Sequence, residues 1–322
     1  MKAIHVLESG GPEKMVLVDV LTPSPGPKQA LIRLKAIGVN FIDVYFRKGL
    51  YKADVPIVLG NEGAGTVEAI GPEVTEVAVG DRVAWAMHRG SYAEYSVVPA
   101  AVLVKTPDGV DFQMAAAAML QGMTAHYLTH STYTLESGKT CLVHAAAGGT
   151  GSLIVQMAKM LGARVLGTVS TEEKAKIARQ AGADETILYT QQDFEAEVKR
   201  LTDGRGVDVV YDSVGQSTFD KSLNSLRPRG LLALFGQSSG PVPPFDPNIL
   251  NGKGSLYLSR PSLAHYLLSR EELLLRAGDV LKWIAAGKLK VRIEHTYPLA
   301  NAAAAHRDLE GRHTAGKLLL IP

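Results

Sequence analysis

The feature that most constrains the fold is an alternation of short apolar strands with helices between residues 140 and 258. Predicted strands span 140–145, 164–169, 185–189, 207–213, 231–235 and 254–258, and predicted helices span 152–161, 171–181 and 194–201. Ser170 and Glu173 predict a capping box at the start of the second helix. Strands that alternate with helices form βαβ units, so this region is predicted to be an α/β domain with a parallel sheet.

The segments on either side of this region have a different pattern. The first 110 residues or so are rich in β-formers and turns, with predicted strands at 30–36, 63–71, 80–85 and 90–98. Helices are predicted over 114–130, interrupted by Gly122, and over 271–286, and a last strand over 317–321. The 322-residue chain therefore suits two domains better than one core.

The composition narrows the class of protein. The chain carries 34 basic and 32 acidic side chains, a net charge of +2 that gives no field to steer it to nucleic acid or an anionic membrane. Cys141 is the single cysteine, so an internal disulfide and a four-cysteine zinc module are excluded. The longest weakly polar stretch, 114–120, is too short to span a bilayer, and the first residues lack the apolar core of a signal peptide. We therefore expect a cytoplasmic protein that works reduced.

A glycine-rich loop follows the first strand of the alternating region. In the G-x-G-x-x-G pattern its positions are Ala146, Gly148 and Gly151, and a helix is predicted to begin near Gly149. Glycines let a pyrophosphate approach the backbone, and the free N–H groups at a helix start bind it. The alternative is a turn that serves packing alone. Its position between a strand and a helix favours dinucleotide binding.

The end of the next predicted strand bears on the choice of dinucleotide. An NAD site places Asp or Glu there to bind the ribose 2′-hydroxyl, but this strand ends in Val169-Ser170, and Lys174 follows one helical turn on. Without the carboxylate a 2′-phosphate is not repelled, and the ammonium attracts it. Taken alone, Lys174 is better explained as a solvated helix lysine. Together with the missing acid it predicts NADPH.

Three motifs together resemble those of a known family. GVNFIDVY stands at 38–45, LGNEGAG at 59–65 followed by GDRV at 80–83, and HAAAGGTG at 144–151. They are similar to the quinone oxidoreductase (ζ-crystallin-like) branch of the zinc-free medium-chain dehydrogenase/reductase superfamily, and look nearest to its bacterial NADPH:quinone reductases. The resemblance covers essentially the whole chain. It implies a doubly wound parallel (Rossmann) sheet in an NADPH-binding domain, 124–262, and a GroES-like β-rich catalytic domain made of 1–123 and 263–322.

The resemblance also implies which residues meet NADPH. Those expected around the nicotinamide are Asn40, Phe41, Ile42, Asp43, Tyr45, Ser213, Phe235, Gly236, Gln237 and Ser238. Those expected at the phosphates and riboses are Tyr127, Gly148, Gly149, Thr150, Gly151, Ser170, Lys174 and Tyr189, with Pro261, Ser262, Leu263 and Arg312 as further candidates.

The same superfamily contains zinc alcohol dehydrogenases, but the residues here argue against that chemistry. In those enzymes one ligand is a Cys near the position of Asn40 and another is the His of a Gly-His-Glu motif, where this chain has Gly60-Asn61-Glu62. Neither Asn is a good zinc ligand. His126 and His130 are spaced to share a helix face, but a pair of histidines without a third ligand does not make a metal site. We expect no metal.

Without a metal, hydride transfer suits an acceptor that is already electron-poor, such as a quinone or a conjugated carbonyl compound. Asn40 is a candidate donor to the developing oxyanion, and Tyr45 or Tyr51 a candidate donor of a hydrogen bond or proton. Asp43 is a candidate orienter that ties down Arg47, although a purely structural ion pair explains this spacing equally well.

NADPH:quinone reductase is the leading hypothesis, and two alternatives stay open. One is reduction of the C=C bond of enones or alkenals on the same scaffold. The other is an NADPH-binding protein with a structural or RNA-binding role, although the near-neutral charge argues against strong RNA affinity. A homodimer is expected through the last predicted strand, 254–258, because it carries no internal charge and exposed edges invite pairing. Cover of this edge within one chain is the alternative.

Overall fold

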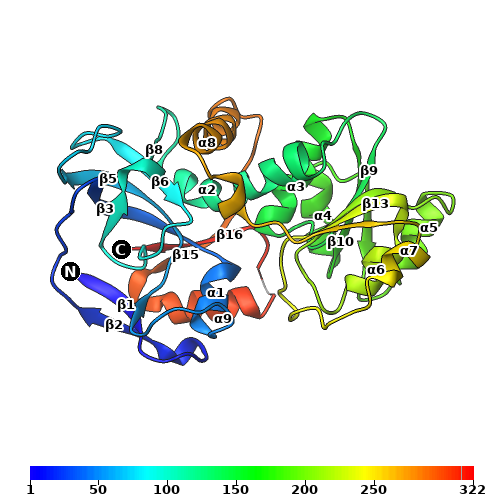
Figure 1. Cartoon of the computed structure of the whole chain (residues 1–322), viewed down its shortest axis with the longest axis horizontal. Helices are drawn as coiled ribbons and strands as arrows, with labels where there is room; N and C mark the ends of the chain where they lie inside the picture. The colour runs from blue at the N-terminus through cyan, green and yellow to red at the C-terminus, as the bar shows by residue number, and fades with distance from the viewer. Residues whose placement is uncertain (313) are drawn as a thin grey trace. The chain divides into compact units, whose positions relative to one another are not determined.

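The computed structural model describes residues 1–312 and 314–322, and the chain divides into two compact units (Figure 1). Unit 1 consists of Met1–Met123 together with Leu267–Pro322, and unit 2 consists of Thr124–Tyr266. Each unit has its own hydrophobic core. In the described part of the chain, no helix is both long enough and apolar enough to cross a membrane.

Unit 2 is an α/β unit. Its strands are β9 (Thr140–Val143), β10 (Arg164–Val169), β11 (Glu185–Leu188), β12 (Val207–Asp212), β13 (Leu226–Leu234) and β14 (Tyr257–Ser259). Its helices are α3 (Gly149–Met160), α4 (Glu172–Gln180), α5 (Phe194–Leu201), α6 (Phe219–Asn224) and α7 (Asn248–Gly252), with the short helical turns η3 (Leu128–Thr132) and η4 (Leu263–Tyr266).

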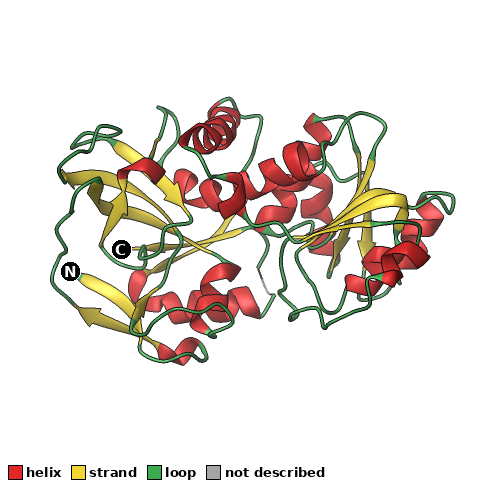
Figure 2. Ribbon diagram, viewed as in Figure 1, coloured by secondary structure: helices red, strands yellow, loops and turns green. Residues whose placement is uncertain are grey.

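The strands of unit 2 form one parallel sheet with the order β11-β10-β9-β12-β13-β14 among the described residues. The chain starts in the middle of the sheet, winds out to β11, returns, and winds out to β14. Such a sheet is doubly wound, and its switch point lies between β9 and β12. Helices α3 and α4 lie on one side of the sheet, and α5, α6 and α7 lie on the other (Figures 1 and 2).

The sequence explains why β10 and β12 are interior strands of this sheet. All six residues of β12 are buried, and in β10 only the first residue is exposed, so both are apolar runs covered on two faces. Helix α4 begins at Glu172, and its N-cap is Thr171, whose hydroxyl accepts from the Lys174 N–H at 3.3 Å. The capping box predicted at Ser170 and Glu173 is therefore wrong by one residue, because Ser170 still belongs to the turn that leaves β10.

The last strand of unit 2 is shorter than predicted. The expected strand covered 254–258, whereas β14 pairs with β13 only from Tyr257 to Ser259. Leu256 is not in this ladder, because its N–H donates to the carbonyl of Leu250 in α7. Strand β14 nevertheless lies at the edge of the sheet.

Unit 1 is rich in strands. They are β1 (Lys2–Val6), β2 (Met15–Asp19), β3 (Gln29–Val39), β4 (Ile57–Val58), β5 (Glu62–Ile70), β6 (Arg82–Ala86), β7 (Tyr95–Pro99), β8 (Val104–Lys105), β15 (Ile293–Pro298) and β16 (Lys317–Ile321). The helices are α1 (Phe41–Arg47), α2 (Phe112–Tyr127), which continues into unit 2, α8 (Arg270–Ala285) and α9 (Ala302–Glu310), with the 3-10 turns η1 (Pro12–Lys14), η2 (Ala100–Val102) and η5 (Leu299–Asn301).

The final strand of the chain completes the main sheet of unit 1. Among the described residues this sheet has the order β15-β16-β3-β5-β6-β8, with β7 beside β3, and β2-β1-β4 form a smaller sheet. Leu318 lies opposite Val39, and Ile37 lies opposite Gly63. The end of β3, the start of β5 and the start of β16 therefore meet, and α1 begins at the same place.

Candidate active site

A group of buried polar side chains lies where β3, β5, β16 and α1 meet in unit 1. Its members, which we call the polar cluster, are Asn40, Asp43, Asn61, Glu62 and Lys317, and each is at most 4% exposed. Buried polar and charged groups are costly unless they are hydrogen-bonded. Their contacts therefore show what the cluster can do.

Glu62 and Lys317 form a fully buried ion pair, with 2.5 Å between Lys317 Nζ and Glu62 Oε2. The carboxylate also accepts from the Asn40 amide at 2.8 Å and from the Leu120 N–H at 2.6 Å. A Cβ on Gly38 would lie 2.1 Å from Glu62 Oε2, so glycine is needed there to leave room for the carboxylate. The two charges of the pair thus balance each other, and the backbone at Gly38 and Leu120 lies directly against the Glu62 carboxylate.

The side-chain amide of Asn40 is held from both sides. Its Oδ1 accepts from Lys317 Nζ at 2.7 Å, and its Nδ2 donates to Glu62 at 2.8 Å and to the Gly38 carbonyl at 3.4 Å. An Asn amide has two N–H donors, and both are directed at these oxygens. A hydrogen bond from Asn40 to a substrate oxyanion therefore requires the longer bond to Gly38 to break. The geometry suits Asn40 better to holding Lys317 and Glu62 in place.

Asp43 is fully buried, and its carboxylate is directed back toward the start of α1. It accepts from the Asn40 N–H at 3.0 Å, from Asn61 Nδ2 at 2.7 Å and from the Tyr92 hydroxyl at 3.4 Å. Burial raises the pKa of Asp43 from 3.8 to about 6, although the Asn61 and Asn40 hydrogen bonds and the charge of Lys317 act the other way.

Arg47 lies four residues after Asp43, but the predicted pair between them does not form. The Arg47 guanidinium binds Glu310 at 2.7 Å and the ring Nδ1 of His306 at 2.9 Å. Through Nε2, His306 lies 2.9 Å from the Tyr92 hydroxyl. Burial, together with the Arg47 charge, lowers the pKa of His306 to about 3, so its ring is neutral. The prediction was wrong because Asp43 turns back onto its own helix start, whereas Arg47 extends toward α9.

The raised pKa of Asp43 predicts a pH dependence of stability. The folded protein holds this proton between about pH 4 and 6, where the unfolded chain has released it, so stability is lost as the pH rises through that window. Relative to an Asp43→Asn variant, we expect wild type to lose on the order of 3 kcal/mol between about pH 3.5 and 7. Urea unfolding at several pH values measures this difference. The exposed Asp54→Asn change is the control, and a pH-independent difference for Asp43→Asn would contradict the assignment.

Aromatic side chains of α1 and the following loop pack beside the polar cluster. The rings of Tyr45 and Tyr51 meet edge to face with centroids 5.3 Å apart, and Phe41 lies 6.3 Å from Tyr45. Tyr45 is buried, while Phe41, Ile42 and Tyr51 are half-buried. Of the two candidate tyrosines, Tyr51 is therefore the one whose side chain is more accessible to a ligand.

The polar cluster does not fit a zinc ion. Asn40 and Asn61 hold the positions expected of ligands, and their side chains are bound to Glu62, Lys317 and Asp43. The Lys317 ammonium already supplies the positive charge that compensates Glu62. Within residues 1–312 and 314–322, no three His, Cys, Asp or Glu side chains are grouped so that they could hold a metal ion. The rings of His126 and His130 stack on each other at 4.3 Å.

In unit 2, the glycine loop runs from the end of β9 into α3. Gly148 is the N-cap of α3 and has no side-chain acceptor, so the first N–H groups of the helix are left for a ligand. A Cβ on Gly151 would lie 2.2 Å from the Ala145 carbonyl oxygen, so Gly151 is required by the packing of the loop itself. Gly148 has a φ of −73°, which any residue adopts, and a Cβ there would lie 3.1 Å from the Ala145 carbonyl oxygen, so a side chain needs only a small shift of the loop. This difference fits a loop whose Gly148 leaves space for a pyrophosphate.

The turn after β10 carries no carboxylate at the strand end. Ser170 follows the last residue of β10, and Tyr189 lies beside it because its N–H donates to the Val169 carbonyl at 3.1 Å. Glu172 opens α4, but its carboxylate pairs with Arg179 at 3.0 Å. Lys174, two residues after Glu172, lies on a different face of the helix. Ser170, Lys174 and Tyr189, the residues expected at a 2′-phosphate, therefore lie at or next to this turn.

The remaining candidates lie at several places. Ser213 follows β12, and Phe235, Gly236, Gln237 and Ser238 follow β13, its neighbour in the sheet. Tyr127 is 1% exposed, and its ring stacks on Tyr266 at 4.2 Å. Pro261 and Leu263 are buried, and Ser262 is half-buried, at the start of η4. Arg312, an exposed residue of unit 1, has a φ of 58°. The glycine loop and the residues after β10, β12 and β13 thus share the carboxyl edge of the sheet.

Several residues of these sites were not candidates from the sequence. Glu62 stands in the LGNEGAG motif and Lys317 in the last predicted strand, but the sequence alone predicts no role for either residue. A signal was present, since Lys317 opens the apolar strand KLLLI and Glu62 lies between an Asn and a glycine. His144, directly after β9, and Asp212, at the end of β12, were also not predicted.

Comparisons with known proteins cover the whole chain. The family described as "Alcohol dehydrogenase GroES-like domain" matches residues 26–108, and the one described as "Zinc-binding dehydrogenase" matches residues 149–270. A quinone oxidoreductase of Pseudomonas aeruginosa is 48% identical over 323 residues, which cover 100% of this chain and 99% of that protein. A 2-haloacrylate reductase of a Burkholderia species is 45% identical, with coverage of 99% and 98%. The solved structure of Escherichia coli quinone oxidoreductase in complex with NADPH is 42% identical, with a TM-score of 0.98 and 100% coverage of both chains.

Proposed function

Because this chain belongs to the quinone oxidoreductase branch of the medium-chain dehydrogenase/reductase superfamily, we propose that it reduces quinones with NADPH. The structural observation that carries the proposal is the carboxyl edge of the unit 2 sheet. There the glycine loop enters α3 at the switch point, and Ser170, the residue directly after the neighbouring strand β10, stands in place of a carboxylate. We assign NADPH binding to 124–262 and the catalytic role to 1–123 with 263–322.

Bound NADPH supplies a hydride, which a quinone accepts together with a proton to give the hydroquinone. The chain contributes binding and orientation. Asn40 and Asp43 hold the polar cluster in one arrangement, as their buried hydrogen bonds require. We propose that Tyr51 donates a hydrogen bond or proton to the acceptor oxygen. The buried ring of Tyr45 packs edge to face against the Tyr51 ring. We assign no step to a metal ion.

The first experiment is a comparison of acceptors. Purified protein is given NADPH with either a 1,4-benzoquinone or an alkenal, and NADPH oxidation is followed. Faster turnover of the quinone supports the proposal. Faster turnover of the alkenal supports C=C reduction, which the similarity to a 2-haloacrylate reductase favours as the second candidate. Binding of NADPH without oxidation by either acceptor would overturn both enzymatic proposals.

Cofactor preference gives a second test. Lys174→Ala is expected to weaken NADPH binding about tenfold, because a charge-assisted hydrogen bond to the 2′-phosphate is lost, and to leave NADH binding nearly unchanged. Fluorescence titration with each cofactor measures both constants. Lys176→Ala is the matched control, since Lys176 is exposed two residues further along α4. Equal losses for NADPH and NADH would show that Lys174 does not contact the 2′-phosphate.

We also propose a cytoplasmic homodimer that pairs through the strand near 254–258. Strand β14 is the sheet edge, and Tyr257 on it is 63% exposed. Because Leu256 is bound to α7, the informative change is Tyr257→Lys, which places a charge on the exposed edge. Light scattering at micromolar concentration is expected to give a dimer for wild type and a monomer for the variant. A wild-type monomer would overturn the assembly.

A further inference from the structure

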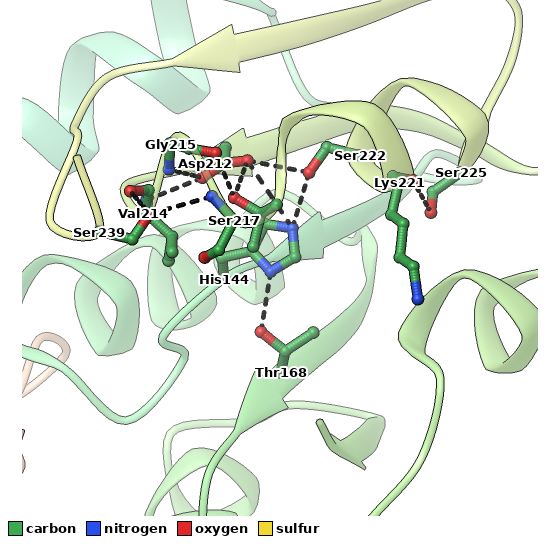
Figure 3. Close-up of polar contacts among 11 residues, drawn as sticks. His144, Thr168, Asp212, Val214, Gly215, Ser217, Lys221, Ser222, Ser225 and Ser239 are labelled. Atoms are coloured by element: carbon green, nitrogen blue, oxygen red, sulfur yellow. Dashed lines mark hydrogen bonds and ion pairs between the residues drawn. The ribbon is translucent and has the colours of Figure 1, made fainter. Parts of the chain in front are cut away.

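The switch point of the unit 2 sheet carries a chain of four buried polar side chains. Thr168 lies on β10, His144 directly follows β9, Asp212 ends β12, and Ser222 lies on α6 (Figure 3). Each of the four is at most 2% exposed. We call this group the His144 chain. It links β9 and β12, the strands on either side of the switch point, to β10, which precedes the proposed 2′-phosphate turn.

The distances fix which group donates at each step. Ser222 Oγ lies 2.8 Å from Asp212 Oδ2, and a carboxylate only accepts, so Ser222 donates its one proton there. Ser222 must then accept from His144 Nε2 at 2.9 Å, which places a proton on Nε2. The other ring nitrogen, Nδ1, is left to accept from the Thr168 hydroxyl at 2.9 Å.

The surroundings of His144 support this single arrangement. Burial lowers the pKa of the ring, although the charge of Asp212 acts the other way, so the imidazole is neutral and one nitrogen can accept. The ring also meets Phe194 edge to face at 4.8 Å, which fixes its orientation. Asp212 is fully satisfied as an acceptor, since Oδ1 takes the N–H groups of Val214 and Gly215 and Oδ2 also takes the Thr218 hydroxyl.

One end of the His144 chain is joined to the glycine loop. His144 is the first residue of that loop, and the Ala146 N–H donates to the Thr168 carbonyl at 3.1 Å. A Cβ on Gly167 would lie 2.7 Å from Ala146 Cβ, so the loop packs closely on β10. The contact between His144 and Thr168 therefore lies next to the contacts that hold the loop against β10.

The other end is joined to the segments proposed to meet the nicotinamide half. The side-chain carboxylate of Asp212 accepts from the N–H groups of Val214 and Gly215 and so stabilises that turn. The backbone carbonyl of Asp212 accepts from the Phe235 N–H at 2.8 Å. Ser239 then closes this loop, because its hydroxyl donates to the Val214 carbonyl at 2.8 Å (Figure 3). The two halves of the proposed cofactor site are thus connected through four side chains.

We propose that His144 is a positioning residue, held by Asp212 through Ser222 as the Nε2-protonated tautomer, and that this directed chain sets the spacing between the glycine loop and the turn at 213–215. This inference rests on the proposed NADPH function, and the role that it adds to the site is one of positioning. A dinucleotide spans both segments, so a change in their spacing weakens its binding.

The direction of the chain is tested by ring-nitrogen NMR on protein labelled with ¹⁵N-histidine, with the His144 signals assigned by their loss in His144→Gln. Wild type is expected to show a protonated Nε2 and an unprotonated Nδ1. In Asp212→Asn an amide donor replaces Oδ2, Ser222 turns to donate to Nε2, and the proton is expected to move to Nδ1. A wild-type ring protonated on Nδ1, or on both nitrogens, would overturn the proposal.

The effect on the cofactor is tested by NADPH titration of two variants. His144→Phe keeps a ring of similar shape but removes both contacts, and Thr168→Val removes one hydroxyl; we expect about tenfold weaker binding for the first and a smaller loss for the second. His144→Gln, which keeps one donor and one acceptor, is expected to bind better than His144→Phe.

Asp208→Asn is the matched control. Asp208 is also buried on β12, but at the opposite end, where it accepts from the Thr140 N–H at 2.8 Å and pairs with Arg227 at 2.6 Å. It is expected to lower stability without weakening NADPH binding. Equal losses of affinity for Asp208→Asn and His144→Phe would mean general loosening of the sheet and would overturn the positioning role. If wild type itself does not bind NADPH, the proposed function fails, and the NMR test of the chain still stands.

Discussion

Replacement of Gly148 by valine is expected to abolish NADPH binding while the protein remains folded. The backbone of Gly148 has φ −73° and ψ 169°, an extended conformation that valine adopts readily. Its added side chain would stand at the N-cap of α3, where the free N–H groups are proposed to meet the pyrophosphate. We expect affinity to fall by more than about a hundredfold, or about 2.8 kcal/mol, in a fluorescence titration.

Two further glycine variants sharpen this test. Gly252→Val is the control, because a Cβ at Gly252 meets nothing within 4 Å and its φ is not positive. Gly151→Ala is expected to lose both stability and binding, since its Cβ would lie 2.2 Å from the Ala145 carbonyl oxygen. Gly148→Val with normal thermal unfolding and retained NADPH binding would show that the loop has a packing role only.

Much of the fold was predictable because it depends on local pattern. The predicted combination of a doubly wound parallel sheet and a GroES-like β-rich domain is confirmed. Strands such as Arg164–Val169 were found with their limits because they are continuous apolar runs between turns. The predicted limits of a strand were wrong where its backbone is hydrogen-bonded to a neighbouring element. An example is Leu256, whose N–H donates to the Leu250 carbonyl.

The polar contacts were less predictable, because they join residues that are far apart in the sequence. Lys317 and Asn40 are separated by 277 positions, and only the pairing of β16 with β3 brings them together. The spacing of Asp43 and Arg47 suggested a helical ion pair, but tertiary contacts with Tyr92 and His306 decided their partners. A pattern of residue types shows which groups are present, and the topology decides which of them meet.

The Glu62–Lys317 pair is expected to be the most sensitive point of unit 1. Lys317→Met keeps most of the side-chain volume but leaves the Glu62 carboxylate buried without a compensating charge. Breaking a buried pair in this way destabilises a protein by about 3–5 kcal/mol, which urea unfolding would measure. Loss of Lys317 also removes the donor that holds Asn40 Oδ1, so the arrangement of the polar cluster is expected to change.

The double variant Glu62→Gln/Lys317→Met separates the cost of an unpaired charge from the cost of lost packing. With both charges gone, most of the stability is expected to return, because a buried pair is nearly balanced by the desolvation of its two ions. Lys2→Met is the matched control: Lys2 pairs with Asp19 at 3.0 Å, but these side chains are 51% and 77% exposed. Exposed pairs contribute about 0–1 kcal/mol, so this variant should unfold almost like wild type. If Lys317→Met is no more destabilising than Lys2→Met, Glu62 does not carry a buried charge, and the polar cluster must hold a proton where an ion pair is assigned.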